Sequence, residues 1–244
     1  MPNGNAAAES PLRLPPDLQS DHRKFTRALA PWLERIDLKD GSRTPASDRA
    51  SPAHDISRLL TEFGLLVYAQ ANRLSVIAKG DRPAIYSRHI LDSLNPVSLF
   101  PLPPRSMLDV GSGGGFPGIP LAIAWPETQI TLLESREKKS GFLEKVVREL
   151  GLRNVAVVCA RLEEFGTGWT AGDQEAVSIR AIGGLSKLLG HLTSICAPQA
   201  RWVYFLGKGT SEGEVIGTLG PFGDGAITAT GEFGGRLLHA RFPA

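Results

Sequence analysis

The sequence has little of what marks the specialised protein classes. Among its 244 residues there are only two cysteines, Cys159 and Cys196, which lie far apart and form no C-x-x-C pair. Such isolated thiols indicate buried cysteines in a reducing compartment rather than a disulfide framework. The formal net charge is only +2, so composition alone does not indicate a nucleic-acid partner, although it leaves room for a local basic face.

Long hydrophobic runs are also missing from the sequence. No apolar stretch approaches the roughly 20 residues of a membrane span. Residues 1–20 lack the apolar core that a signal peptide needs. With 42% hydrophobic and 21% charged residues, the composition is that of an ordinary globular protein. We therefore expect a cytoplasmic protein with no membrane partner, and we predict no metal site.

The first hundred residues have a helical character. Residues 1 to about 20, rich in Pro, Asn, Ala and charge, are expected to be disordered, and a linker is expected over 39–52. Apolar spacing predicts helices over 22–38, with Pro31 limiting or kinking it, over 54–70, and over 86–94, ended by Pro96. This predicts a flexible or partly helical extension over 1–53 and a helical segment over 54–104.

From residue 105 the pattern changes to alternating strands and helices, which predicts an α/β domain over 105–244 with a mostly parallel sheet. The expected strands are 106–110, 129–133, 155–159, 176–179 and 202–206, and the expected helices are 119–125, 136–150 and 185–195. Two final strands, 226–230 and 236–242, are joined across a glycine pair and predict an antiparallel edge.

A glycine-rich turn follows the first expected strand, at residues 111–115. A turn without side chains lets backbone N–H groups approach a ligand closely. A dinucleotide fingerprint, G-x-G-x-x-G, would need glycine at position 116, where the chain has Phe116. The observed spacing, G-x-G-x-G from Gly111 through Gly113, is typical of S-adenosylmethionine sites. The alternative is a glycine-rich surface turn.

The ends of the next three strands carry residues suited to a nucleoside ligand, because ligands of open α/β sheets bind at these ends. Glu134 could accept hydrogen bonds from ribose hydroxyls, Leu162 could pack on adenine, and Glu163 could accept from its amino group. Arg180 could meet a carboxylate or a phosphate. Singly, Leu162 is more typical of a core residue and Glu163 of a solvated charge. Jointly, the four strand ends favour a nucleoside-cofactor site.

Several strings in the chain resemble a known family. They are Arg88-His-Ile-Leu-Asp-Ser-Leu94, Leu108-Asp-Val-Gly-Ser-Gly-Gly-Gly-Phe-Pro-Gly-Ile-Pro-Leu121, Leu132-Leu-Glu-Ser135, Lys138-Lys-Ser-Gly-Phe-Leu143, Arg161-Leu-Glu163, Ser178-Ile-Arg-Ala181 and Lys208-Gly209. Together they make residues 54–210 resemble the bacterial ribosomal RNA small subunit methyltransferase G family, also called the glucose-inhibited division B family. The segment before residue 54 is longer than this family leads us to expect, and the tail after Gly209 matches it weakly.

The resemblance implies a class I S-adenosylmethionine-dependent methyltransferase fold, Rossmann-like with an N-terminal helical part, that methylates N7 of a guanine in 16S ribosomal RNA. The implied cofactor contacts are Gly111, Gly113, Phe116, Glu134, Leu162, Glu163 and Arg180. The expected RNA contacts are Arg88, Arg180 and Lys208, and no residue is assigned as catalytic. The expected partner is 16S RNA or the small ribosomal subunit, bound by a monomer.

His89 and Asp92 could be mistaken for an acid–base pair. A helical i, i+3 pair, or a brace against the glycine turn, is the preferred interpretation. Three other functions stay open at this point. One is a class I methyltransferase acting on another RNA, a protein or a small molecule. The others are a nicotinamide-dependent oxidoreductase, which the glycine spacing disfavours, and an RNA-binding module without activity.

Overall fold

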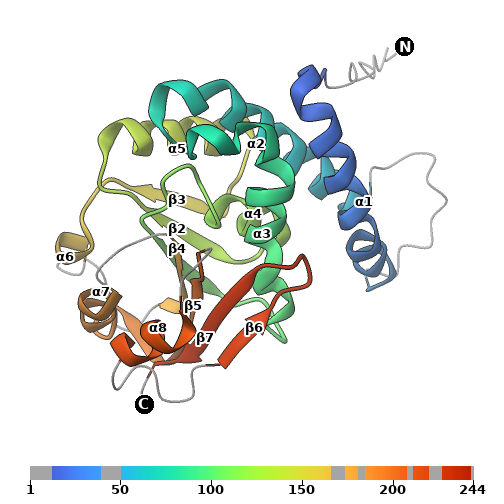
Figure 1. Cartoon of the computed structure of the whole chain (residues 1–244). Helices are drawn as coiled ribbons and strands as arrows, with labels where there is room; N and C mark the ends of the chain where they lie inside the picture. The colour runs from blue at the N-terminus through green and yellow to red at the C-terminus, as the bar shows by residue number, and fades with distance from the viewer. Residues whose placement is uncertain are drawn as a thin grey trace, which may run out of the picture.

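A seven-stranded sheet forms the centre of the protein (Figure 1). The computed structural model describes residues 13–39, 51–165, 174–180, 185–207, 211–219 and 227–242. The strands are β1 (Ser106–Val110), β2 (Gln129–Leu133), β3 (Val155–Val158), β4 (Gln174–Arg180), β5 (Cys196–Phe205), β6 (Ile227–Thr230) and β7 (Arg236–Arg241). Their order is β3-β2-β1-β4-β5-β7-β6.

The first five strands are parallel, and β7 and β6 complete the sheet in antiparallel fashion. The predicted mostly parallel sheet with an antiparallel edge is confirmed. The strand order reverses at β1, because β2 and β3 lie on one side of it and β4 pairs with its other edge. A crevice at the carboxyl ends of the strands, where the order reverses in this way, is the usual ligand site of such sheets.

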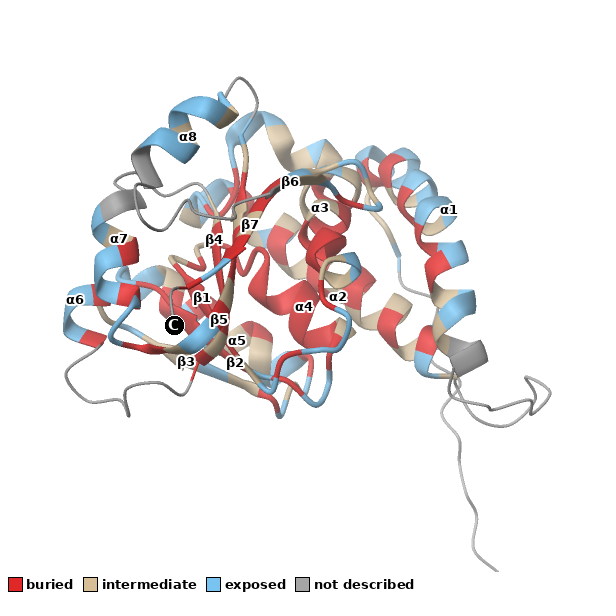
Figure 2. Ribbon diagram, turned by 90° about the horizontal axis from the view of Figure 1, so that it is seen from below, coloured by how far each residue is buried: buried red, intermediate tan, exposed pale blue. Residues whose placement is uncertain are grey.

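Alternate strand residues enter two apolar cores, one on each face of the sheet (Figure 2). In β1, for example, Met107 belongs to one core and Leu108 to the other. The first core takes in α2 (Pro52–Leu74), α4 (Gly118–Ala124) and α5 (Glu137–Glu149). The second takes in α6 (Leu162–Phe165), α7 (Leu185–Leu192) and one side chain of α8 (Glu212–Leu219).

The long N-terminal helix α1 (Pro16–Lys39) belongs to the first core. It begins at Pro16, so the expectation of disorder was wrong for residues 16–20. It contains the whole of the helix expected over 22–38 and continues through Pro31, which therefore does not end it. Proline inside a helix costs about 3 kcal/mol, whereas burying one large apolar side chain stabilises by about 1.5–3 kcal/mol. Phe25, Leu29 and Trp32 are all buried here, so their packing outweighs the proline.

The helix expected over 86–94 is divided into a π-helical turn and a short α-helix, and a 3₁₀ helix flanks them on each side. These are the 3₁₀ helix η1 (Lys79–Ala84), the π-helical turn η2 (Ile85–Ile90), α3 (Leu91–Leu94) and the 3₁₀ helix η3 (Asn95–Ser98). π-helical turns occur frequently at functional sites. In the described part of the chain, no helix has both the length and the apolar character needed to cross a membrane.

Candidate functional site

A cavity of about 1000 Å³ lies at the carboxyl ends of the central strands. Its wall includes the turn after β1, Arg180 at the end of β4, and residues 204–207 at the end of β5. The η1–η2 region and the turn between β6 and β7 complete it. Segments far apart in sequence therefore meet at the point where the strand order reverses, which is where the sheet topology predicts a ligand.

The glycine turn is fixed to the neighbouring strand through its backbone. The N–H groups of Gly111 and Ser112 both donate to the Leu133 carbonyl, at 2.8 and 3.0 Å. Gly113 has a φ of +57°, which L side chains rarely adopt. A Cβ on Gly114 would lie 2.5 Å from the Val76 carbonyl oxygen. The turn thus needs glycine both for its own conformation and for close packing against the chain after α2.

Glu134 connects the glycine turn to the start of α5. Its Oε2 accepts a hydrogen bond from the Gly113 N–H at 2.9 Å, and its Oε1 accepts one from the Arg136 N–H at 2.8 Å. The residue is buried, with 6% of its surface exposed. Each oxygen retains a further lone pair. Glu134 therefore holds the turn in shape and can still accept from a ligand at the end of β2.

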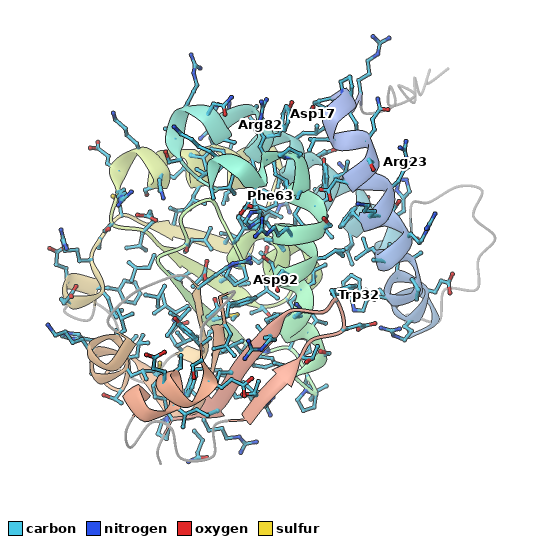
Figure 3. The ribbon with its side chains drawn as sticks, in the orientation of Figure 1. Asp17, Arg23, Trp32, Phe63, Arg82 and Asp92 are labelled. Atoms are coloured by element: carbon cyan, nitrogen blue, oxygen red, sulfur yellow. The ribbon has the colours of Figure 1, made fainter. Side chains whose placement is uncertain are left out.

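Phe116 supplies an apolar wall beside the turn. Its ring lies 5.1 Å from the ring of Phe63 and 5.2 Å from that of His89, measured between centroids. Figure 3 shows Phe63 reaching inward from α2. The ring of Phe116 lines the cavity while its far side is held by these neighbours, so it is a rigid aromatic surface that a flat ligand could contact.

Asp81 of η1 joins Arg88 and His89 at one side of the cavity. It forms an ion pair with Arg88, and one of its oxygens lies 3.1 Å from Nε2 of His89. Burial, with a contribution from the positive charge of Arg180, lowers the pKa of His89 from 6.5 to about 4. His89 is therefore neutral at pH 7, and its Nε2–H donates to Asp81.

Arg180 closes the wall between the glycine turn and the end of β5. Its guanidinium pairs with Asp92 at 2.7 Å, contacts Ser93 Oγ at 3.2 Å, and lies 5.1 Å from the centroid of the Phe205 ring. Burial lowers the pKa of Arg180 and raises that of Asp92, and each partner's charge opposes that effect on the other. Asp92 points from α3 toward this region in Figure 3.

Asp109 supports the same wall from below. Its Oδ1 accepts from Ser178 Oγ at 2.7 Å, and its Oδ2 accepts from the Gly118 N–H at 3.3 Å. Burial raises the pKa of Asp109 to about 6. These bonds tie β1 to β4 and to the start of α4, so the two strands on either side of the reversal point are cross-linked beneath the cavity.

The structure brings together five of the residues expected to form the site. Gly111, Gly113, Phe116, Arg88 and Arg180 line the cavity, and Glu134 adjoins it through its bond to Gly113.

Two other expected residues, Leu162 and Glu163, lie apart from the cavity lining. Leu162 is buried in the second apolar core, together with Phe165, and Glu163 is exposed. The expected RNA contact Lys208 lies outside the residues that the structure describes, directly after Gly207 of the cavity wall.

The interpretation of His89 and Asp92 as a helical i, i+3 pair was wrong, because each has a different partner, Asp81 and Arg180 respectively. Both residues do brace the cavity wall. The pairing could not be predicted from the spacing, because the π-helical turn at 85–90 changes which side chains share a face.

Sequence reasoning missed several wall residues altogether. Val76 and Ile77 after α2, Tyr204 in β5 and Phe233 between β6 and β7 all line the cavity. Each looks like an ordinary apolar core residue in the sequence. Only the packing of distant segments brings them to the site, so no local pattern could have identified them.

Residues 57–216 match a family model described as rRNA small subunit methyltransferase G. A protein of that name from Stutzerimonas stutzeri is 39% identical over 150 residues, which are 62% of this chain and 68% of the relative. Another, from Acidiphilium cryptum, is 34% identical over 187 residues, or 76% and 77% of the two chains. A third, from Chromobacterium violaceum, is 38% identical over 176 residues, or 72% and 80%.

Solved structures resemble the fold. A SAM-dependent methyltransferase from Aquifex aeolicus aligns with a TM-score of 0.53 at 18% identity, over 67% of this chain and 95% of that one. A methyltransferase from Geobacter sulfurreducens aligns with a TM-score of 0.52 at 13% identity, over 86% and 96%. At such identities the likeness shows the fold alone, and that fold is the Rossmann-like one predicted from the sequence.

Proposed function

The chain belongs to the rRNA small subunit methyltransferase G family, and we propose that it transfers a methyl group from S-adenosylmethionine to N7 of a guanine in 16S ribosomal RNA. The observation that carries this proposal is the cavity at the reversal point of the sheet, where the glycine turn is fixed by Glu134. We further propose that it acts in the cytoplasm, as a monomer, on the small subunit or its RNA.

The residues around the glycine turn fit a nucleoside cofactor. A Cβ on Gly113 would lie 3.7 Å from the Gly111 carbonyl oxygen and 4.0 Å from Lys139 Nζ, so a side chain there would enter space beside the turn. The bare backbone, the free lone pairs of Glu134 and the wall of Phe116 would hold the cofactor. S-adenosylmethionine supplies an electrophilic methyl group on a positively charged sulfur. We retain Leu162 and Glu163 as proposed adenine contacts that would require the chain near α6 to approach the cavity.

Methyl transfer to guanine N7 does not require the protein to remove a proton. N7 carries an in-plane lone pair and no proton, so its attack needs no general base. His89 fits this requirement, because its neutral ring is held by Asp81 rather than directed as a base. The protein's contribution is to align the reacting atoms and to exclude water. Asp81 and Asp92 line the same cavity, where each is paired with an arginine, Arg88 and Arg180 respectively.

Cationic side chains on the cavity rim suit the RNA backbone, since affinity for RNA is largely electrostatic. Arg88 has 46% of its side chain exposed and lines the cavity. Arg180 lies deeper, with 18% exposed, so it suits a single phosphate or the target nucleotide better than the outer backbone. Lys208 remains a proposed RNA contact because it follows Gly207 of the wall directly.

Transfer of labelled methyl tests the proposal. Purified protein would be incubated with labelled S-adenosylmethionine and with naked 16S RNA, intact small subunits, large-subunit RNA or total protein. We expect label in 16S RNA or in the small subunit and background levels elsewhere. Label confined to protein, to large-subunit RNA or to small molecules would instead support a class I methyltransferase with a different substrate.

A further inference from the structure

Two segments outside the family match contact each other beside the cavity. The match covers residues 57–216, whereas α1 ends at Lys39 and β6 begins at Ile227. Trp32 of α1 lies edge-on to Phe233 in the turn between β6 and β7, with ring centroids 6.4 Å apart and planes at 79°. Figure 3 shows Trp32 between α1 and this turn. These two segments, which flank the matched residues in sequence, therefore pack against each other in the fold.

The turn between β6 and β7 is held from both sides. On one side Trp32, with 6% of its surface exposed, packs against Phe233, and Arg35 forms an ion pair with Glu232. On the other side the Phe233 N–H donates to Asn95 Oδ1 at 2.8 Å. Phe233 itself is only partly buried and lines the cavity. Its ring position thus depends on α1 while its backbone depends on η3.

The opposite end of α1 holds another part of the cavity wall. The carboxylate of Asp21, with 6% of the residue exposed, accepts from the N–H groups of Tyr86 at 2.8 Å and Ser87 at 3.3 Å, and from Ser87 Oγ. Ser87 and the two residues after it line the cavity. Eleven residues separate Asp21 from Trp32, a rise of about 16 Å along a helix. One helix therefore fixes the separation of two walls.

The wall at Phe233 belongs to the substrate half of the cavity. The glycine turn and Glu134 follow β1 and β2, so a nucleoside cofactor occupies that side. Phe233 precedes β7, which pairs with β5 beyond β4. Aromatic side chains of nucleic-acid-binding sites commonly stack on unpaired bases.

We propose that α1 is a strap behind two walls of the cavity, and that its Trp32 is a positioning residue that holds Phe233 for stacking on a base of the RNA. This inference rests on the proposed function. Trp32 touches no ligand in this account and acts only through Phe233, so its loss should affect RNA binding and leave cofactor binding intact.

Steady-state kinetics of Trp32→Ala, Phe233→Ala and the double variant test this proposal. Base stacking on an aromatic residue accounts for about fivefold or more in affinity, so we expect Phe233→Ala to raise the KM for RNA at least about fivefold. Trp32→Ala should also raise the KM for RNA, and Trp32→Phe should bring it most of the way back to the wild-type value. The KM of the double variant should be no higher than that of Phe233→Ala. Cofactor affinity, measured by calorimetry with S-adenosylhomocysteine, should stay within about twofold.

Leu192→Ala is the matched control, because Leu192 is a fully buried residue of α7 in the second core, apart from both walls that α1 holds. It should lower stability while leaving the KM for RNA within about twofold. Should Trp32→Ala fail to fold, Arg35→Met loosens the same turn from an exposed position. An unchanged KM in the Trp32 or Arg35 variant, or multiplicative effects in the double variant, would overturn the proposal.

Amide hydrogen exchange separates this proposal from the proposed function, because it requires no activity. Loss of Trp32 should speed exchange of the Phe233 N–H, which is bonded to Asn95, and Leu192→Ala should do so far less. Equal exchange in the two variants refutes the strap even if the protein methylates RNA. If the loss of Trp32 speeds this exchange but the wild-type protein leaves 16S RNA unmodified, the structural role of the strap is retained and its role in RNA binding is refuted.

Discussion

The substitution Glu134→Gln tests most sharply whether Glu134 holds the glycine turn on the cofactor side of the cavity. The substitution keeps the shape of the side chain but exchanges one acceptor oxygen for an NH₂ donor. Both oxygens now accept from backbone N–H groups, those of Gly113 and Arg136. An amide can satisfy only one of the two, so the other N–H faces a donor. A hydrogen bond to a charged group contributes about 1.5–3 kcal/mol.

The expected consequence appears first in the protein without cofactor. Loss of about 1.5–3 kcal/mol should lower the Tm by about 3–12 °C for a protein of this size. Cofactor affinity should fall as well, by about 1–3 kcal/mol, because the turn loosens and an acceptor is lost. Differential scanning calorimetry gives the first quantity, and titration with S-adenosylhomocysteine gives the second.

Glu144→Gln makes the same chemical change on the exposed surface of α5, where substitutions usually change stability by less than about 0.5 kcal/mol. Its Tm and cofactor affinity should match those of the wild type. A Glu134→Gln protein with an unchanged Tm but weaker cofactor binding would show that Glu134 meets only the ligand. A protein with both quantities unchanged would remove Glu134 from the site.

Two further predictions concern the turn and the cavity wall. Gly114→Ala should destabilise the protein by about 1–3 kcal/mol, since its Cβ would lie 2.5 Å from the Val76 carbonyl oxygen. Gly141→Ala, in open space within α5, should instead stabilise it by about 0.5–1 kcal/mol. Urea denaturation measures both changes, and equal effects of the two substitutions would contradict the close packing of Gly114 against Val76. The lowered pKa of His89, about 4 against 6.5 in the unfolded chain, means that the unfolded state binds the extra proton first. The contribution of His89 to stability should therefore fall as pH drops below 6.5, by roughly 2 kcal/mol between pH 7 and pH 5. The raised pKa of Asp109 acts in the opposite direction over this range, so the comparison is between wild type and His89→Gln, which should lack the His89 contribution. A His89→Gln variant with the same pH dependence as the wild type would show that folding does not lower the pKa of His89.

The sheet could be predicted from the sequence where the information is local. The limits of β1 and β2 and the glycine turn between β1 and α4 follow from short apolar runs and from glycine spacing. Glu134 was found the same way, because it directly follows β2. Its bond to Gly113 was not expected, since it depends on the parallel pairing of β1 with β2.

The rest of the site arises from contacts between distant segments, which local patterns do not encode. The ion pair of Arg180 with Asp92 and the packing of Trp32 on Phe233 join residues 88 and 201 positions apart. Whether Pro31 would end or only interrupt the helix expected over 22–38 could not be decided for the same reason, because the burial that outweighs the proline occurs only in the folded protein. Leu162 matched a family motif, yet its side chain is buried in the second core.

The chemical position of the transferred methyl group tests the central claim most directly. Methylation at guanine N7 makes the base cationic, so reduction with borohydride followed by aniline cleaves the RNA chain at the modified nucleotide. After incubation of the protein with S-adenosylmethionine and 16S RNA or small subunits, this account predicts one enzyme-dependent cleavage, at a guanine, mapped by primer extension. Labelled 16S RNA that resists cleavage, or enzyme-dependent cleavage only in other RNAs, would contradict it.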